Sequence, residues 1–506
     1  MCPSLNLLEI LKPPAKKPYK VKENISINNL NRTKIIATVG PASSGVDVLH
    51  DLMVAGCSIF RINFSHGHLD QHAQAIDNIR SVASSLGQYV AIFGDLQGPK
   101  IRIGAIVGDS FELKSGQQLL LDSAIADDAG SIDGVSYKCD TLAQSCEPGS
   151  VLMLDDGRVQ LEVLEVNGDA IQTKVLAGTK LSSRKGINLL GGGLAEDALT
   201  EKDLKDMAFA VDKKLDYICV SFPSSEQDML DARTQLDSMN GSHLKLIAKL
   251  ERAEVVASQD IIDDMINSCD GVMVARGDLA VEVGFQAVTS YQKQIIARAR
   301  TLNKPVIVAT QMMESMIDSP VPTRAEASDV ANAVFDYTDA VMLSGETAVG
   351  SYPVEVVRAV YDVVVATEKH VVTQVSKHRV ECDFEFVDES IAMATMYLAN
   401  HFRSVKAIAC LTESGSTALW MSRIKTHLPL VAMSSNSNTL NRVALYKGVR
   451  PAHMPDVIQN RQQLDELIVF LKQVVDLKSG DHVVVTYGDV AGVDGHTNTL
   501  KVLSVP

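Results

Sequence analysis

Eight short apolar runs rich in Val and Ile recur along this chain, and most of them are followed by a longer amphipathic segment. Continuous apolar strands that alternate with helices predict a parallel sheet covered by helices on both faces. Eight such units predict a closed (β/α)8 TIM barrel of the α/β class, with an open doubly wound sheet as the alternative. The runs span residues 34–39, 58–63, 90–95, 216–221, 244–249, 271–275, 305–310 and 339–344.

The spacing of these runs breaks once, between the third and the fourth. Alternating apolar and polar residues in GQQLLLD, SVLMLDDG and QLEVLEV predict a small all-β domain there, and the GGG at 191–193 predicts a hinge back into the barrel. A separate α/β segment follows, with helices expected near 388–402 and 460–475 and strands at KAIACL, PLVAM and HVVVTY. The predicted domains are a tail (1–30), a catalytic barrel (31–102 and 201–370), a β lid (103–200) and a C-terminal α/β regulatory domain (371–506).

Composition narrows the class of protein. A length of 506 residues predicts several domains, and a net charge of −15 argues against a nucleic-acid partner. The eight cysteines form no CxxC pair, which is typical of reduced thiols. No apolar run reaches the roughly 18 residues that a membrane span needs, and the short LNLLEIL is not interpreted as a signal peptide. We therefore expect a soluble cytoplasmic protein without a membrane partner.

Polar residues collect where the predicted strands end. In a TIM barrel the chemistry lies at the carboxyl ends of the strands, and the residues found there are too polar for a core. They are Arg61, Asn63, Asp95, Lys249, Glu251, Arg276, Asp278, Thr310, Ser344 and Glu346.

Two of these residues, Glu251 and Asp278, follow neighbouring strands. Mg²⁺ prefers one or two protein carboxylates, with substrate oxygens and water completing its octahedron, so the two predict a magnesium site. Lys249 and Arg61 add permanent cations, and such a set is suited to a phosphorylated acid. The alternative is that Lys249 and Glu251 form an ordinary ion pair at the barrel rim.

The stretch ARGDLA (275–280) predicts a second kind of site. Gly277 lets the backbone approach a ligand, and the amides of Gly277 and Asp278 at a helix N-terminus favour a carboxylate. Thr310 has the chemistry to bind a carboxylate or relay a proton. The alternatives are a turn with a capping Asp and a simple strand-end Thr. P-loop, Rossmann, HExxH and GxSxG motifs are absent from the sequence, and His66 and His68 are interpreted as turn residues.

Eight longer motifs resemble those of one family, pyruvate kinase, in its order. They are KIIATVGPAS, FRINFSHG, GDLQGPKIR, KLERAE, VMVARGDLA, VIVATQMMESM, PTRAEASDVANAV and VMLSGETAVGSYP. The resemblance spans residues 32–506. It implies phosphoryl transfer from phosphoenolpyruvate to ADP, giving ATP and pyruvate, the last step of glycolysis.

The resemblance also implies a role for each matching residue. Glu251 and Asp278 match ligands of Mg²⁺, for which Mn²⁺ can substitute, and Lys249 and Arg61 match contacts to the transferred phosphoryl group. Thr310 matches the start of the proton relay to the enolate carbon. The substrate set also includes Gly277, Asp278, Ser344 and Glu346. The nucleotide-side set is Thr38, Pro41, Asn63, His66, Arg102 and Lys185.

The loop after the third strand departs from the pattern of many family members. Those members have Thr-Lys after the aspartate and a Glu two residues beyond the Gly, and they need potassium. Here Leu96, Gln97 and Lys100 stand at these positions, and Ile103 follows Arg102, which resembles the branch that works without potassium. Residues that align with the potassium ligands are Asn63, Ser65 and Asp95.

We therefore hypothesise that the Lys100 ammonium occupies or electrostatically replaces the potassium site, and K⁺ is not expected to be required. The alternative is a lysine that points to solvent.

The stretch TESGST (412–417) predicts a regulatory site. Its hydroxyls and amides lie between an expected strand and helix, where they would hold a phosphate; the candidate residues are Thr412, Ser414, Gly415, Ser416 and Thr417. The segments 434–438 and GDVAGVDGHTNT are expected to close over a bound sugar. Simple helix capping is the alternative. The resemblance implies a homotetramer activated by a phosphorylated sugar or a nucleotide, and the SGST loop is more similar to the branch that responds to sugar monophosphates or AMP.

Two rival functions remain open from the sequence. The first is a magnesium-dependent lyase or aldolase that binds a pyruvate enolate, which would have no use for a lid over ADP. The second is a catalytically silent regulatory protein, which the presence of Lys249, Glu251 and Asp278 argues against.

Overall fold

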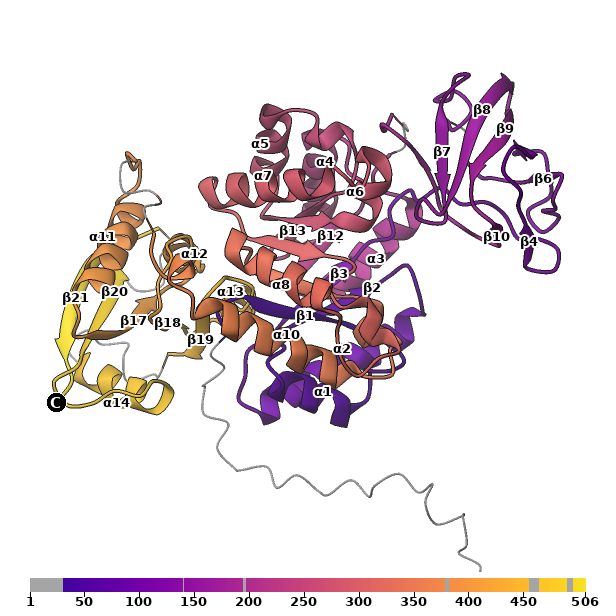
Figure 1. Ribbon diagram of the computed structural model, residues 1–506. Helices are drawn as coiled ribbons and strands as arrows, with labels where there is room; N and C mark the ends of the chain where they lie inside the picture. The colour runs from indigo at the N-terminus through magenta and orange to yellow at the C-terminus, as the bar shows by residue number, and fades with distance from the viewer. Residues whose placement is uncertain are drawn as a thin grey trace, which may run out of the picture.

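The computed structural model describes residues 31–139, 141–193, 197–376, 378, 382–454, 464–488 and 495–506. Figure 1 shows a central barrel with a β domain on one side and a C-terminal α/β domain on the other. Within the described residues, no helix is long and apolar enough to cross a bilayer.

Eight parallel strands form the closed central barrel, in the order β1-β16-β15-β14-β13-β12-β3-β2. The barrel closes where β1 pairs with β16, with Ile35 opposite Val341. The predicted TIM barrel is therefore confirmed, and the open-sheet alternative is wrong. Each apolar run of the sequence gives one strand: β1 Lys34–Val39, β2 Ile59–Asn63, β3 Ala91–Asp95, β12 Tyr217–Val220, β13 Lys245–Leu250, β14 Gly271–Ala275, β15 Val306–Ala309 and β16 Ala340–Leu343.

Helices surround the barrel, and several begin at strong capping signals. Thr200 and Asp203 form a capping box at the start of α3, and Thr323 and Glu326 form one at the start of α8. The main barrel helices are α1 Val46–Val54, α2 Leu69–Ser85, α3 Glu201–Asp212, α4 Glu226–Ser238, α5 Gln259–Asn267, α6 Arg276–Val283, α7 Val288–Thr301, α8 Arg324–Asp336, α9 Gly345–Ala348 and α10 Pro353–Glu368.

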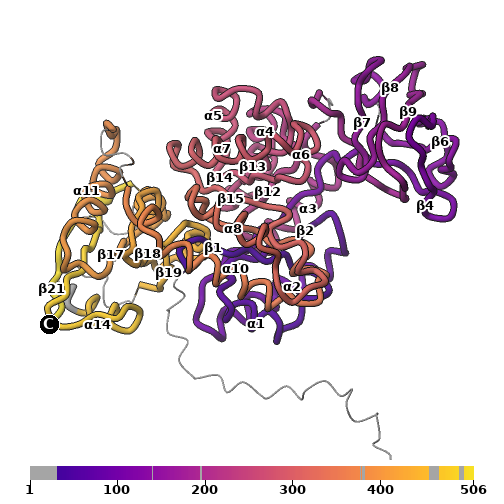
Figure 2. The backbone as a smooth tube through the Cα atoms, in the orientation of Figure 1, coloured from indigo at the N-terminus to yellow at the C-terminus, as the bar shows by residue number. Residues whose placement is uncertain are grey.

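The inserted domain lies between β3 and α3 and is built from β-strands, as the alternation predicts. Its six-stranded sheet has the order β11-β7-β8-β9-β5-β6, and β10 pairs with β4. The two connections to the barrel run side by side, because Arg102 bridges Gly186 in antiparallel fashion (Figure 2). The strands are β4 Ser110–Glu112, β5 Gln118–Asp122, β6 Gly134–Val135, β7 Val151–Leu154, β8 Val159–Asn167, β9 Ala170–Ala177, β10 Lys180–Ser182 and β11 Ile187–Leu189.

The C-terminal domain has a five-stranded sheet of order β19-β18-β17-β20-β21, with only β21 antiparallel. The sequence predicted its three central strands and missed the two edge strands. Its strands are β17 Val405–Leu411, β18 Leu430–Ser434, β19 Val449–His453, β20 His482–Gly488 and β21 Thr497–Ser504. Its helices are α11 Val387–His401, α12 Ser416–Ser422, α13 Ser437–Val443 and α14 Leu464–Val474.

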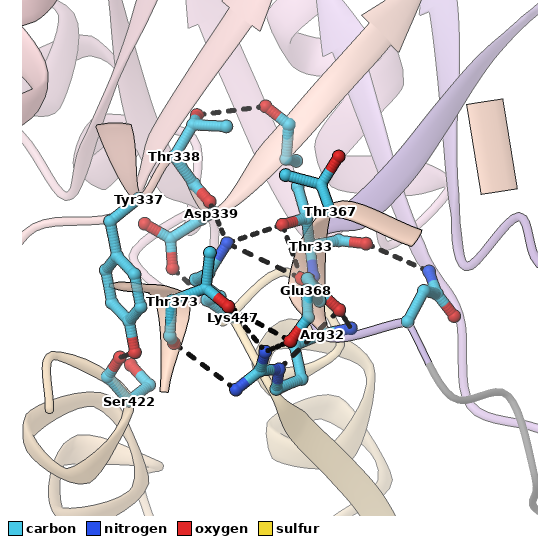
Figure 3. Close-up of polar contacts among 12 residues, drawn as sticks. Arg32, Thr33, Tyr337, Thr338, Asp339, Thr367, Glu368, Thr373, Ser422 and Lys447 are labelled. Atoms are coloured by element: carbon cyan, nitrogen blue, oxygen red, sulfur yellow. Dashed lines mark hydrogen bonds and ion pairs between the residues drawn. The ribbon is translucent and has the colours of Figure 1, made fainter. Parts of the chain in front are cut away.

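A buried polar network joins the N-terminal end of the barrel to the C-terminal domain (Figure 3). Arg423 is fully buried, and its Nη1 lies 2.9 Å from Asp339 Oδ2, while Asp339 Oδ1 accepts from the Lys447 amide at 2.8 Å. Glu368 accepts from the amides of Arg32 and Thr33, each at 2.7 Å. The C-terminal domain is thus attached to the end of the barrel where β1 and β16 begin.

The buried ion pair between Arg423 and Asp339 sets the stability of this junction. We expect Arg423→Met to lower the free energy of unfolding by about 3–5 kcal/mol, because it leaves the Asp339 carboxylate buried without its charge partner. Thermal or urea unfolding measures the loss. Arg403→Met, at an exposed position in the loop before β17, is the control and should change stability little. An Arg423→Met protein as stable as the control would contradict this assignment.

Candidate active site

The carboxyl ends of β2, β3, β12 and β13 bring a cluster of charged side chains together at one rim of the barrel. At its centre is Asp95, of which only 1% is exposed. Arg61 donates from Nε to Asp95 Oδ2 at 2.7 Å, and Lys249 Nζ lies 3.5 Å from Asp95 Oδ1. Burial alone would raise the pKa of Asp95, but Lys249 and Arg61 hold it below its ordinary value. Asp95 therefore remains an anion that holds two cations in place.

The Lys249 ammonium contacts the side-chain oxygens of three residues. It donates to Ser221 Oγ at 2.8 Å and lies 3.4 Å from Glu251 Oε2, in addition to Asp95. Burial lowers the pKa of Lys249, but the charges of Asp95 and Glu251 outweigh it and raise the pKa above its usual value. Lys249 is therefore a fixed positive charge at the rim.

Glu251 is fully buried and only half satisfied. Its Oε1 accepts from the Phe222 amide at 2.8 Å, whereas its Oε2, though buried, accepts no hydrogen bond. Burial, with Asp278 adding to it, raises the pKa of Glu251 to about 7. A buried carboxylate oxygen without a hydrogen bond is suited to a cation, so Glu251 and Asp278 fit the requirements of a hard divalent metal. Groups of three or more His, Cys, Asp or Glu able to hold a metal do not occur among the described residues.

Lys100 lies on the second of these carboxylates. Its ammonium donates to Asp278 Oδ1 at 2.8 Å, and its side chain is only 19% exposed, so the solvent-pointing alternative is wrong. The hypothesis that the Lys100 ammonium occupies or electrostatically replaces the potassium site stays a prediction, and the structure gives the partners of the residues that align with the potassium ligands. Asp95 is paired with Arg61 and Lys249, and Asn63 Oδ1 accepts from the Ser65 amide at 3.1 Å.

Thr310 and Gly277 meet across the ends of β15 and β14. The Gly277 amide donates to Thr310 Oγ1 at 2.8 Å, and the Thr310 hydroxyl donates to the Ala309 carbonyl at 2.6 Å. Thr310 and Gln311 have φ values of 70° and 52°, a left-handed backbone that costs of order 1–3 kcal/mol at each non-glycine residue. Backbone strain of this kind is typical of active sites and ligand-binding sites.

Arg276 stabilises the strained backbone at Thr310 through hydrogen bonds to main-chain carbonyls. Its guanidinium donates to the carbonyls of Thr310 at 2.6 Å and Ala309 at 3.2 Å, and it pairs with Asp329 at 2.7 Å. The sequence placed Arg276 at the rim without a role. The structure shows that Arg276 fixes the backbone of Ala309 and Thr310 and thereby positions the Thr310 hydroxyl.

The loop after β16 is fixed by a buried carboxylate. Glu346 Oε2 accepts from the Ser344 amide at 2.6 Å, and Oε1 accepts from the Met313 amide at 3.2 Å. The two bonds tie the ends of β16 and β15 together beside Thr310.

These rim residues open onto a cavity of about 590 Å³ shared with the inserted domain. Gly277, Asp278, Thr310, Ser344 and Glu346 line it from the barrel, and the inserted domain lines it with Met153, Asp156, Gly157 and Gln160. The sequence analysis missed these four residues of the inserted domain, because alternation of apolar and polar residues predicts strands but not what the turns between them face.

The residues expected on the nucleotide side are dispersed. Thr38 is buried, and its hydroxyl accepts from Arg61 at 3.1 Å and donates to the Leu343 carbonyl at 2.8 Å. Arg102 donates to the Arg184 carbonyl at 3.1 Å, and Lys185 pairs with Asp155 at 2.6 Å. Both therefore lie where the inserted domain joins the barrel.

Two further nucleotide-side positions lie in loops after strands. Pro41 is exposed in the loop after β1. Burial, with Arg102 and Arg61 adding to it, lowers the pKa of His66, so its imidazole is neutral near pH 7.

The expected effector residues form a loop that is bonded to itself and to β21. Thr412 Oγ1 accepts from the Gly415 amide at 2.9 Å, the hydroxyls of Ser414 and Ser416 lie 3.1 Å apart, and that of Thr417 lies 2.9 Å from Thr497. In the loop 434–438, Asn436 caps α13. Residues 489–494 of the other expected closing segment lie outside the described residues.

Sequence reasoning missed Ser221, which follows β12 directly. It donates to the Leu96 carbonyl at 2.7 Å and accepts from Lys249. The next residue, Phe222, has a φ of 57°, which aims its amide at Glu251. The signal was present, since Ser221 ends the fourth apolar run, but that strand end was not included among the polar ones.

Comparisons with known proteins agree with this geometry. The family model "Pyruvate kinase, barrel domain" matches residues 30–357, and "Pyruvate kinase, alpha/beta domain" matches residues 389–503. The chain belongs to the pyruvate kinase family.

Curated pyruvate kinases from several bacteria are similar over nearly the whole chain. Pyruvate kinase II of Salmonella typhimurium is 48% identical over 476 residues, which cover 94% of this chain and 99% of that protein. The pyruvate kinase of Haemophilus influenzae is 46% identical with the same coverage, and that of Geobacillus stearothermophilus is 39% identical over 93% of this chain and 80% of that protein. The resemblance of the motifs to pyruvate kinase is thus confirmed.

The Ser221 hydroxyl positions Lys249, which gives a test. We expect Ser221→Ala to lower kcat about tenfold to a hundredfold, because the ammonium loses a charge-assisted hydrogen bond worth about 1.5–3 kcal/mol. Steady-state kinetics measure the loss, and thermal unfolding should change little. Ser238→Ala, on the exposed end of α4, is the matched control. Equal kcat values for the two variants would show that the hydrogen bond from Lys249 to Ser221 does not contribute to catalysis.

Proposed function

We propose that this chain transfers the phosphoryl group of phosphoenolpyruvate to ADP, producing ATP and pyruvate. The observation that carries the proposal is the Lys249 ammonium held within 3.5 Å of three oxygens, beside a buried carboxylate oxygen that accepts no hydrogen bond. Membership of the pyruvate kinase family supports the same reaction.

Glu251 and Asp278 would hold the divalent cation, Mg²⁺ or Mn²⁺. When bound, this cation would neutralise charge on the phosphoryl and enolate oxygens. Glu251 Oε2 accepts no hydrogen bond but lies 3.4 Å from the Lys249 ammonium, so the metal ligands and this fixed cation would act on the same phosphoryl group.

Lys249 and Arg61 would bind the phosphoryl group during transfer. Two phosphate groups brought to 4 Å repel by about 4 kcal/mol per pair of charges at an effective dielectric near 20, so fixed cations are needed between them. Arg61 is held by Asp95 and Thr38, and Lys249 by Asp95, Glu251 and Ser221. The cations are therefore positioned before the substrate arrives, which is the arrangement that stabilises transition-state charge.

The substrate carboxylate would bind at the N-terminus of α6, near Gly277 and Asp278, because amides at a helix start favour an anion. Thr310 would then relay a proton, giving the proton of Oγ1 to the enolate carbon and taking its replacement from solvent in the cavity. Ser344 and Glu346 would support this step through the loop that they fix beside Thr310.

The nucleotide would bind toward the inserted domain, near Thr38, Pro41, Asn63, His66, Arg102 and Lys185. Closure of this domain over the 590 Å³ cavity would exclude water, which otherwise accepts the phosphoryl group. Three consecutive glycines at 191–193, all with positive φ, would serve as the hinge of the return connection, because glycine adopts such backbone conformations without steric cost.

The regulatory part of the proposal concerns assembly and location. It comprises a homotetramer in the cytoplasm, activated by a phosphorylated sugar or nucleotide bound near residues 412–417. Family membership and the hydroxyl-rich loop before α12 support it.

A coupled assay for pyruvate tests the reaction. With phosphoenolpyruvate, ADP and Mg²⁺ we expect pyruvate to form, and omission of ADP should abolish it. Lys249→Met should lower kcat by about 100- to 1,000-fold, because a positioned charge is removed from the transferring group. Lys174→Met, on the inserted domain, is the control. Pyruvate formation without ADP would indicate a lyase, and a complete absence of pyruvate would refute the proposed reaction.

Potassium independence is a separate prediction. Lys100 places a covalent ammonium on Asp278, so the rim carries a fixed monovalent charge without a bound ion. We expect activity in a sodium- and potassium-free tetramethylammonium buffer to be at least half of that with potassium. Lys100→Gln should lower the activity about tenfold or more, whereas Lys174→Gln should not. A strong potassium requirement of the unaltered chain would contradict this role.

A further inference from the structure

Two further acids follow the carboxylates proposed to bind the cation, each about one helical turn later in the chain. Glu282 comes four residues after Asp278 on α6. Glu254 comes three residues after Glu251, in the 3₁₀ turn Glu254–Val256 that follows β13. Figure 1 shows α6 on the side of the barrel that faces the inserted domain. The proposed reaction uses neither of these two acids.

The Glu282 carboxylate joins three segments of the chain. The residue lies on α6 and is 3% exposed. Its Oε2 accepts from the amide of Ala253, which follows Glu251 by two residues, at 2.8 Å. Its Oε1 accepts at 3.3 Å from the side-chain amide of Asn188, which is buried in β11, the last strand of the inserted domain. One carboxylate therefore connects the helix of Asp278, the loop of Glu251 and the inserted domain.

The glycines of the return connection are held by the same two acidic residues. The Gly191 amide donates to the main-chain carbonyl of Glu282 at 2.9 Å. The Gly193 amide donates to Glu254 Oε1, also at 2.9 Å. A Cβ atom on Gly192 would lie only 2.5 Å from Glu254 Oε2, so this glycine packs directly on the carboxylate. The proposed hinge of the inserted domain is therefore attached to both elements that carry the carboxylates proposed to bind the cation.

A small cavity of about 20 Å³ lies between these groups. Glu282 and Asn188 line it, and so do Lys100 and Phe222. Lys100 binds the carboxylate of one proposed metal ligand, and the Phe222 amide binds that of the other. A cavity of this size is too small for a substrate and has room for about one water molecule, so its polar lining groups act on one another. The partners of both proposed metal ligands therefore meet beside Glu282.

The burial of Glu282 has a cost in free energy. Burial, with the charge of Glu254 adding to it, raises the pKa of Glu282 to about 7, against the opposing effect of the Ala253 amide and Arg252. An apolar side chain of similar size would fill the same space without this cost. Buried carboxylates with a perturbed pKa are typical of functional sites. The role of Glu282 therefore lies in the groups that it holds.

We infer that Glu282 is a positioning residue that couples cation binding at Glu251 and Asp278 to the placement of the inserted domain. The loop and the helix that carry these two carboxylates also hold the return connection, through Glu254 and Glu282. Where both carboxylates bind one cation, their elements are fixed relative to each other, and the return connection is fixed with them. By linkage, the position of the inserted domain that this favours also favours the cation. The inference deepens the proposed function and rests on its assignment of Glu251 and Asp278 to the cation.

Amide exchange at the return connection tests the coupling directly. We would follow the deuterium uptake of the segment 187–193 by mass spectrometry in the full-length protein, with and without saturating Mn²⁺. In the unaltered protein we expect Mn²⁺ to slow the uptake about threefold or more, because the amides of Gly191 and Gly193 donate to the two elements that a bound cation fixes. Unchanged uptake on saturation with Mn²⁺ would overturn the inference.

Two substitutions of Glu282 separate its hydrogen bonds from its charge. Glu282→Met removes both acceptors, so we expect it to weaken Mn²⁺ binding about tenfold or more and to lower kcat by a similar factor, with little change in KM for ADP. Glu282→Gln keeps an acceptor for the Ala253 amide and, after rotation of the Asn188 amide, a donor to its oxygen, so both quantities should stay within about threefold of the unaltered protein. Electron paramagnetic resonance of free Mn²⁺ measures binding. Equal losses in the two variants would show that Glu282 acts through its charge and would refute the positioning role.

A third variant and a control complete the set. Asn188→Leu removes only the hydrogen bond from the inserted domain, so it should reduce the slowing of exchange by Mn²⁺ to about half or less. Full slowing in this variant would contradict the coupling, even if Glu282→Met does not fold. Glu162→Met, at a half-buried position on β8, is the control and should leave Mn²⁺ binding, kcat and exchange unchanged. Thermal unfolding shows which variants are folded.

Mn²⁺ binding and amide exchange need no turnover, so their outcome is distinguishable from that of the proposed reaction. If the unaltered protein forms no pyruvate, but Mn²⁺ slows exchange at 187–193 and Asn188→Leu weakens this effect, the coupling stands and the reaction is wrong. If pyruvate forms but exchange is the same with and without Mn²⁺, the reaction stands and the coupling is wrong.

Discussion

The closure of the barrel by the pairing of β1 with β16 is the constraint on which the rest of the structure depends. Because all eight strands are parallel, closure brings their carboxyl ends to one rim and their amino ends to the other. The same two strands serve both rims. At the active-site rim, Thr38 is the penultimate residue of β1 and Ser344 follows β16. At the other rim, Lys34 begins β1 and Asp339 precedes β16, against the C-terminal domain. A break in this pairing would disturb the chemistry and the domain junction together.

Buried acids organise the cations at both ends of the barrel. At one rim Asp95 holds Arg61 and Lys249, and at the other Asp339 holds Arg423. The two ends differ in whether the buried carboxylate oxygens all have hydrogen-bond partners. Asp339 also accepts from the Lys447 amide, so its oxygens are satisfied by the protein, whereas Glu251 keeps one buried oxygen that accepts no hydrogen bond. A buried carboxylate whose hydrogen bonds all come from the protein stabilises the contact between two domains. A buried carboxylate with an oxygen that accepts no hydrogen bond is suited to binding a cation.

The sequence predicted the barrel well because its strands are buried on both faces, which makes each an apolar run that ends in a polar residue. It missed β19 and β21, which lie at the edges of their sheet and are partly polar, with Pro451 inside β19. The motif resemblance named the rim residues, but spacing cannot tell which carboxylate a lysine meets. Lys100 was expected to occupy or electrostatically replace the potassium site, and nothing in the sequence indicated that its ammonium pairs with Asp278.

The way the inserted domain joins the barrel has a consequence for how such a chain could be assembled. The outgoing and returning strands lie side by side, with Arg102 bridging Gly186 and the Ile103 amide donating to the Lys185 carbonyl at 2.9 Å. The inserted domain therefore connects to the barrel as a loop does, because the two ends of the insertion lie next to each other. The entropy of closing a loop grows only with the logarithm of its length, so a domain could be gained or exchanged here at small cost to the host fold.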